Sequence, residues 1–175
     1  LNPYSMKTFG HKVNGDYEVG GLIGWNEGGI ISNSNATGNV FAKIQDTGGL
    51  IGYNNGNITN SYAEGYVNGD YGVGGLIGYS YGNIINSVYA TGDVNGNQAV
   101  GGLIGDNDWF SANSFVANSY STGKVTGNTE VGGLIGRNYK DLFNSYSTGK
   151  TDGVLNTGGL IGLNASLVTE YLKNY

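Results

Sequence analysis

The chain has 175 residues, enough for one domain, and contains 34 Gly, 14 Tyr, one Pro and no Cys. Its net charge is −5 and only 12% of its residues are charged, so it has no basic stripe for phosphates, which argues against nucleic-acid binding. The lack of Cys excludes a disulfide framework and thiolate metal sites, and no apolar run is long enough to span a bilayer.

An internal repeat is the main signal. The string Gly-Gly-Leu-Ile-Gly occurs six times, separated by steps of 28, 26, 27, 31 and 26 residues. Such a period indicates a solenoid or another repeat architecture. The six copies begin at Gly20, Gly48, Gly74, Gly101, Gly132 and Gly158.

The rest of each unit follows in a fixed order. A Val or Thr precedes each Gly-Gly, and an Asn follows two residues after most copies, with Ser80 as the exception. An apolar residue comes next, at Ile30, Ile58, Ile84, Leu142 and Val168, with Phe115 or Val116 in the fourth copy. Asn-Ser-Tyr-Ala-Thr-Gly-like segments follow at 33–38, 60–65, 86–92, 118–123 and 144–149. Most units close on a pair such as Asn68-Gly69 or Asp152-Gly153, which predicts a tight turn with positive φ.

These short segments, rich in Ile, Val, Tyr and Thr and bounded by Gly and Asn, are typical of strands. We therefore predict an all-β fold, a parallel β-helix or solenoid of about six coils of 26–31 residues. Equivalent residues would lie roughly 4.8 Å apart, so that Ile packs on Ile, Tyr stacks on Tyr and Asn side chains form amide ladders. A closed repeat of β-hairpins, such as a propeller or prism, is the alternative.

The Gly-Gly-Leu-Ile-Gly strand makes two further predictions. Its adjacent Leu and Ile should point to opposite faces, so both faces should be covered. Its glycines indicate that another backbone lies close against it. We expect one repeat domain over residues 1–175, in which residues 163–175 form a half-repeat or a cap.

The repeated Gly-Leu-Ile-Gly core, as in Gly21-Leu22-Ile23-Gly24, with its Asn and Asn-Ser-Tyr-Ala-Thr-Gly-like flanks, resembles the GLUG motif family. The resemblance runs from about Val13 to Asn164. It implies an extracellular or cell-surface location in bacteria and a spacer or adhesin-like role, as in filamentous-haemagglutinin-like proteins and the non-catalytic parts of immunoglobulin A peptidases. It implies no catalytic residue.

The residues themselves offer little for catalysis. The single His, His11, has no nucleophile motif to serve and is interpreted as a surface or cap residue. Acids such as Asp16, Asp70 and Glu130, with Asp93 and Asp152, are explained by turn chemistry, and no pair is expected to converge as in a glycosidase. Asp106 and Asp108 offer a weak calcium pattern that ordinary loop chemistry also explains. We predict no catalytic residue, cofactor or metal.

Two surface features remain. The Thr column at Thr37, Thr91, Thr122 and Thr148 raises the idea of an ice-binding face, but strand propensity explains it equally well. The fourth unit is longer by five residues, and its inserted loop at 108–113 carries Trp109 and Phe110, the candidate ligand contacts.

The sequence thus predicts a non-catalytic structural or adhesive repeat module. A carbohydrate- or protein-binding module that uses the inserted loop is the alternative, and a carbohydrate-active enzyme or an ice-binding solenoid is less favoured. Expected partners are a host or cell-surface protein or glycan and neighbouring repeats of a longer chain.

Overall fold

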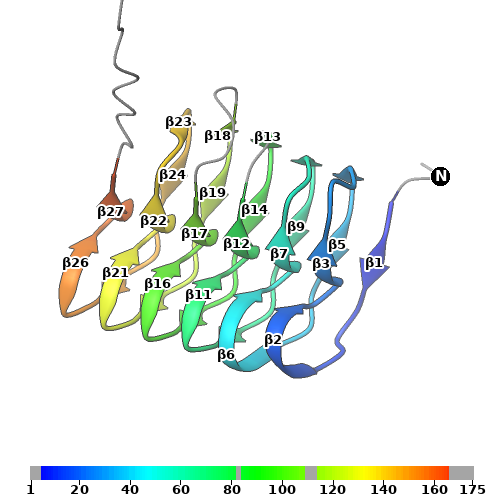
Figure 1. Cartoon of the computed structure of the whole chain (residues 1–175), viewed down its shortest axis with the longest axis horizontal. Helices are drawn as coiled ribbons and strands as arrows, with labels where there is room; N and C mark the ends of the chain where they lie inside the picture. The colour runs from blue at the N-terminus through cyan, green and yellow to red at the C-terminus, as the bar shows by residue number, and fades with distance from the viewer. Residues whose placement is uncertain (1–4, 82–83, 109–113, 166–175) are drawn as a thin grey trace, which may run out of the picture.

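The computed structural model describes residues 5–81, 84–108 and 114–165. It is the predicted all-β parallel solenoid of about six coils, drawn from its N-terminal to its C-terminal coil in Figure 1. We number the coils 1 to 6 by the leucine of each repeat core, from Leu22 in coil 1 to Leu160 in coil 6. Among the described residues there is no helix that is long and apolar enough to cross a membrane.

Each coil passes through four parallel sheets, named A to D. Sheet A contains β1 (Lys7–Thr8), β5 (Asn35–Ala36), β9 (Tyr62–Ala63), β14 (Tyr89–Ala90), β19 (Tyr120–Ser121) and β24 (Tyr146–Ser147). Sheet C contains β3 (Ile23–Asn26), β7 (Ile51–Asn54), β12 (Ile77–Ser80), β17 (Ile104–Asn107), β22 (Ile135–Asn138) and β27 (Ile161–Asn164). Sheet D contains β4 (Ile31–Ser32), β8 (Ile58–Thr59), β13 (Ile84–Asn86), β18 (Phe115–Ala117) and β23 (Asp141–Phe143).

Sheet B is the largest because the chain crosses it twice, at the end of one coil and at the start of the next. The closing strands are β10 (Val67–Asn68), β15 (Val94–Asn95), β20 (Val125–Thr126) and β25 (Thr151–Asp152). The opening strands are β11 (Tyr71–Gly74), β16 (Gln98–Gly101), β21 (Thr129–Gly132) and β26 (Leu155–Gly158). In β2 (Val13–Gly20) and β6 (Val40–Gly48) the two parts are continuous.

Equivalent residues lie directly above one another. The amide of Leu22 donates to the carbonyl of Leu50 at 2.9 Å, and each later leucine repeats this bond to the next as far as Leu160. Tyr62 and Tyr89 stack at 4.8 Å, and the ladder continues through Tyr120 to Tyr146. The predicted columns are confirmed.

The prediction that the adjacent Leu and Ile point to opposite faces is wrong. Leu50 and Ile51 belong to the same buried cluster, because the leucine lies in the bend before β7 and not in the strand. Ile30 and Ile84 do not fill the next core position: they are 75% and 36% exposed, whereas their neighbours Ile31 and Ile85 are at most 2% exposed. Adjacent strand residues face opposite ways, and the sequence did not show which of two isoleucines points inward.

The glycines of the repeat core bring backbones together, as predicted. A Cβ on Gly78, the last residue of its core, would lie 2.5 Å from the carbonyl carbon of Asp46 in coil 2. That backbone covers the second face of the strand. The Asn-Gly pairs do not have the expected positive φ. At Gly69 a side chain is excluded by packing instead, because an added Cβ would lie 2.9 Å from Val73 Cγ2. The predicted cap falls mostly outside the described residues, which give only β26 and β27 in coil 6.

Candidate functional site

The opening strands of sheet B lie beside the strands of sheet C along the solenoid, and we call the strip between their facing side chains the groove. One column in sheet B lies two residues before each Gly-Gly, and the residue there has a φ between +45° and +62° in every coil. This left-handed conformation is costly for residues other than Gly and persists only where the surroundings enforce it. In coils 1 to 5 the glycine backbone of the next coil lies close against this residue. The column contains Glu18, Asp46, Gly72, Ala99, Glu130 and Asn156.

The facing column in sheet C is aromatic in its first three coils. Trp25 and Tyr53 stack with ring centroids 4.3 Å apart, and Tyr53 and Tyr79 stack at 5.5 Å with nearly parallel planes. In coils 4 and 5 the same column carries Asp106 and Arg137. The groove therefore changes from aromatic to charged along the solenoid.

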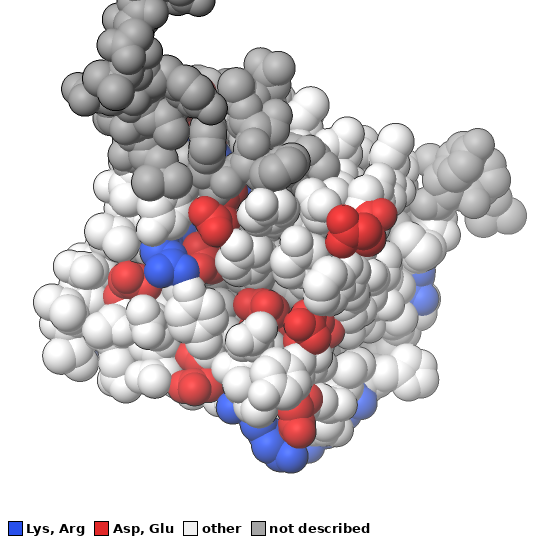
Figure 2. All heavy atoms as spheres, in the orientation of Figure 1, with Lys and Arg blue, Asp and Glu red and all other residues white. Residues whose placement is uncertain are grey.

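The N-terminal part of the groove opens into a hollow of about 410 Å³. We call this space the hollow; its lining comprises Glu18, Gln45, Asp46 and Tyr71 from sheet B, and Trp25, Tyr53, Tyr79 and Tyr81 from sheet C and the residues after it. Figure 2 shows acidic side chains on this face of the molecule.

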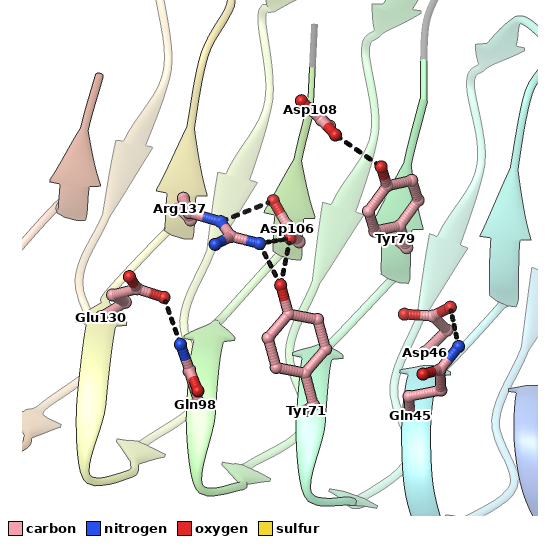
Figure 3. Close-up of polar contacts among 9 residues, drawn as sticks. All are labelled: Gln45, Asp46, Tyr71, Tyr79, Gln98, Asp106, Asp108, Glu130 and Arg137. Carbon is pink, nitrogen blue, oxygen red and sulfur yellow. Dashed lines mark hydrogen bonds and ion pairs between the residues drawn. The ribbon is translucent and has the colours of Figure 1, made fainter.

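Asp46 is the buried acid of the hollow, with 6% of its surface exposed. The side-chain amide of Gln45 donates to its Oδ2 at 3.3 Å (Figure 3). Burial, together with the negative charges of Glu18 and Asp106, raises the pKa of Asp46 to about 7. An acid that loses its proton near neutral pH is a feature of functional sites more often than of structural ones.

Beyond Tyr71 the groove is filled by a charge network (Figure 3). The guanidinium of Arg137 donates from Nε to Asp106 Oδ1 at 3.1 Å and from Nη2 to Asp106 Oδ2, and it also donates to the Tyr71 hydroxyl. Tyr71 in turn donates to Asp106 Oδ2 at 2.9 Å. Burial raises the pKa of Tyr71, and the charge of Asp106 adds to this effect. Further along, Gln98 donates to Glu130 at 3.4 Å.

A second cation lies beneath this network. The Asn ladder inside sheet C is interrupted at Ser80, and the ammonium of Lys140 reaches this gap from coil 5, donating to the Ser80 carbonyl at 3.2 Å. Lys140 is only 7% exposed, and burial lowers its pKa to about 7. Elsewhere the ladder is intact, with Asn26 donating to Asn54 and Asn107 donating to Asn138, each at 2.8 Å.

The structure separates the two residues of the weak calcium pattern. Asp106 pairs with Arg137, whereas Asp108 accepts a hydrogen bond of 2.6 Å from Tyr79. The described residues contain no group of three His, Cys, Asp or Glu that would hold a metal ion. His11 is exposed at the N-terminal end. Trp109 and Phe110 lie outside the described residues.

The acids were interpreted too simply from the sequence. Glu130 lies on strand β21 and not in a turn, and Glu18 and Asp46 share the hollow although no pair was expected to converge. Their common signal was available, because three of the six residues that stand two before a Gly-Gly are acidic.

The coils are parallel and in register, and their interior is filled by identical residues. The residues that differ between the repeats line the groove. These features define a β-solenoid repeat protein. More specifically, three consecutive repeats of the chain match the family model described as the GLUG motif, at residues 15–40, 45–68 and 69–95. The structure continues the same register through the later copies at Gly101, Gly132 and Gly158. Neither the curated proteins nor the solved structures gave a match to the chain.

Proposed function

We propose that the chain is a non-catalytic structural and adhesive repeat module of a bacterial extracellular or cell-surface protein. The observation that carries this proposal is the hollow. The solenoid is stabilised by its own side-chain ladders, and on one face it presents the buried acid Asp46 beside aromatic rings. A concave site with a few converging polar groups is the default position for ligand binding. The resemblance to adhesin-like proteins supports the location.

The adhesive role is testable with beads. Beads coated with the wild-type chain should adhere to epithelial cells more strongly than beads coated with the heat-unfolded chain. The variant Asp46→Asn alters the hollow, and the double variant Trp109→Ala, Phe110→Ala alters the inserted loop. Loss of adhesion in the first variant alone would assign adhesion to the hollow. Equal adhesion by folded and unfolded chains would refute the proposal.

The location requires a separate measurement. Antibodies against the repeat should label intact bacteria that produce the full parent protein, and added protease should remove the label. Labelling only after the cells are opened would contradict a surface location.

The inserted loop keeps its own candidate function, a carbohydrate- or protein-binding surface formed by Trp109 and Phe110. Two large aromatic side chains in one loop are suited to stacking on sugars. A glycan array that gives signal with the wild-type chain and loses it with Trp109→Ala would support this function. An array without signal would contradict the glycan form of the idea.

A carbohydrate-active enzyme is the second candidate function, favoured by one observation. Glu18 and Asp46 hold equivalent positions in adjacent coils and both line the hollow, and glycosidases use a pair of carboxyl groups. Release of reducing ends from polysaccharides, abolished by Glu18→Gln and by Asp46→Asn, would establish this activity. We favour binding over catalysis, because hydrogen bonds and negative charge in the groove already surround one cation, the guanidinium of Arg137.

A further inference from the structure

The groove already contains one cation of the chain itself, the guanidinium of Arg137. Arg137 makes two hydrogen bonds to the carboxylate of Asp106, whose surface is fully buried. Its guanidinium carbon lies 5.5 Å from the ring centroid of Tyr71 and 5.9 Å from that of Tyr139. A carboxylate with aromatic rings beside it is the arrangement that stabilises a desolvated guanidinium, through charge-assisted hydrogen bonds and cation–π attraction.

The hollow contains the same chemistry without the cation. Asp46 is as inaccessible as a core residue, Glu18 lies next to it, and Tyr71 separates both from Arg137. The ion pairs of the described residues are Lys43 with Asp16, Lys124 and Lys150 with Asp152, and Arg137 with Asp106. Within the described part of the chain, neither Glu18 nor Asp46 therefore has a cationic partner.

We propose that the hollow binds a cationic side chain of a partner protein, foremost the guanidinium of an arginine. This inference deepens the proposed adhesive function by naming the chemistry of the partner, and rests on that function for its biological setting. The guanidinium donates hydrogen bonds to the carboxylates of Asp46 and Glu18.

The geometry favours a cation over a sugar. Tyr53 is stacked between Trp25 and Tyr79, so both of its ring faces are occupied. Sugars and cations both use ring faces, so the preference for a cation comes from the acids, because a buried carboxylate is stabilised by positive charge. The volume of about 410 Å³ is at the small end for ligand sites and suits one or two side chains. Arginine is favoured over lysine because the guanidinium is planar and more weakly hydrated.

The test compares two ligands that differ mainly in charge, N-acetyl-arginine amide and N-acetyl-citrulline amide. Each is titrated at pH 8 into the full chain, and binding is followed by chemical-shift changes of the backbone amides. We expect the arginine ligand to shift the amides of residues 17–19, 45–47 and 71–72 and to bind at least about tenfold more tightly than the citrulline ligand, since a desolvated charge pair is worth several kcal/mol when one partner is lost.

Two variants locate the site and one controls for charge. Asp46→Asn and Glu18→Gln should each weaken arginine binding, Asp46→Asn by at least about tenfold. Glu64→Gln removes the same charge from an exposed position outside the hollow and should leave the affinity unchanged. Thermal melting of every variant confirms folding. The absence of arginine binding, equal binding of both ligands, or binding that survives both hollow variants would overturn the inference.

The bead assay separates this inference from the proposed function. Arginine binding without adhesion would leave the site in place and remove the adhesive role. Adhesion that is unaffected by Asp46→Asn and by an excess of the arginine ligand would keep the adhesive role and show that the hollow does not serve it.

Discussion

The two halves of the groove between sheets B and C both contain acidic side chains but differ in their charge balance. From Tyr71 onward, Arg137 neutralises Asp106, and Lys140 fills the gap below Ser80. Before Tyr71, Asp46 and Glu18 line an open hollow beside stacked rings. The repeat fixes the backbone equally in both halves, so the difference comes only from the residues that break the columns.

The largest expected effect comes from removing the internal cation. Arg137→Met leaves Asp106 buried and unpaired, and the free energy of unfolding should fall by about 3–5 kcal/mol, measured by chemical denaturation. Lys124→Met breaks a half-exposed ion pair and should cost no more than about 1 kcal/mol. Adding Asp106→Asn to Arg137→Met should recover most of the loss. A cost below that of Lys124→Met would contradict the charge balance described here.

The second cation should appear in the pH dependence of stability. The folded pKa of Lys140 is about 7, below its unfolded value of 10.5, so the unfolded chain binds an extra proton between these values. The wild-type free energy of unfolding should therefore rise from pH 7 to pH 10 by roughly 2–4 kcal/mol from this group.

The variant Lys140→Met tests this assignment, because it should lack that rise. Lys150→Met, at an exposed position, serves as the control and should keep it. Parallel profiles for the wild type and Lys140→Met would exclude Lys140 as the source.

In the open half, the contribution of Asp46 to stability should change with pH in the opposite direction. The folded pKa of Asp46 is about 7 and its unfolded value is 3.8, so the proton stabilises the folded state below about pH 4 and this stabilisation is lost as the pH rises through 7. The groups that set this value are Glu18 and Asp106, which raise it, and the amide of Gln45, which lowers it. Asp46→Asn should therefore gain stability over the wild type as the pH rises from 4 to 8, in thermal melts.

The arginine ligand sharpens this comparison, because it favours the ionised carboxylate. Its affinity for the wild-type chain should increase as the pH rises through 7, and the increase should vanish in Asp46→Asn. Glu64→Gln should retain the wild-type behaviour in both measurements. A flat affinity profile would mean that Asp46 does not contact the ligand.

The smallest effect is expected from building a cation into the open half. Gln45→Arg replaces the neutral donor to Asp46 by a charged one and should lower the pKa of Asp46 by about 1–3 units, followed by carboxyl NMR. The gain in stability at pH 8 should not exceed about 1–2 kcal/mol, because the new side chain loses rotamer freedom. Arginine binding should be lost, and retained binding would place the ligand elsewhere.

Much of the architecture was predictable because a solenoid repeats each local decision. The six Gly-Gly-Leu-Ile-Gly copies placed Leu22 to Leu160 in one row, and the Asn and Tyr ladders formed as expected. The direction of Leu50 and Ile51 was predicted wrongly because the leucine lies in a bend, so that both side chains enter one core. The paired acids of the hollow were missed for another reason: their φ is positive, and nothing in the identity of Glu18 or Asp46 indicates such a conformation.

By itself the sequence determined the period, the strand composition and the columns, because identical residues at equal spacing stabilise one another only when stacked in register. Only the tertiary structure decided which side chains share a space. It brought Arg137 to Tyr71, 66 residues away, and Lys140 to Ser80, 60 residues away, because each coil returns the chain to the same edge. It also decided which acids acquire a cation, since this depends on side chains that reach across coils and not on the repeat.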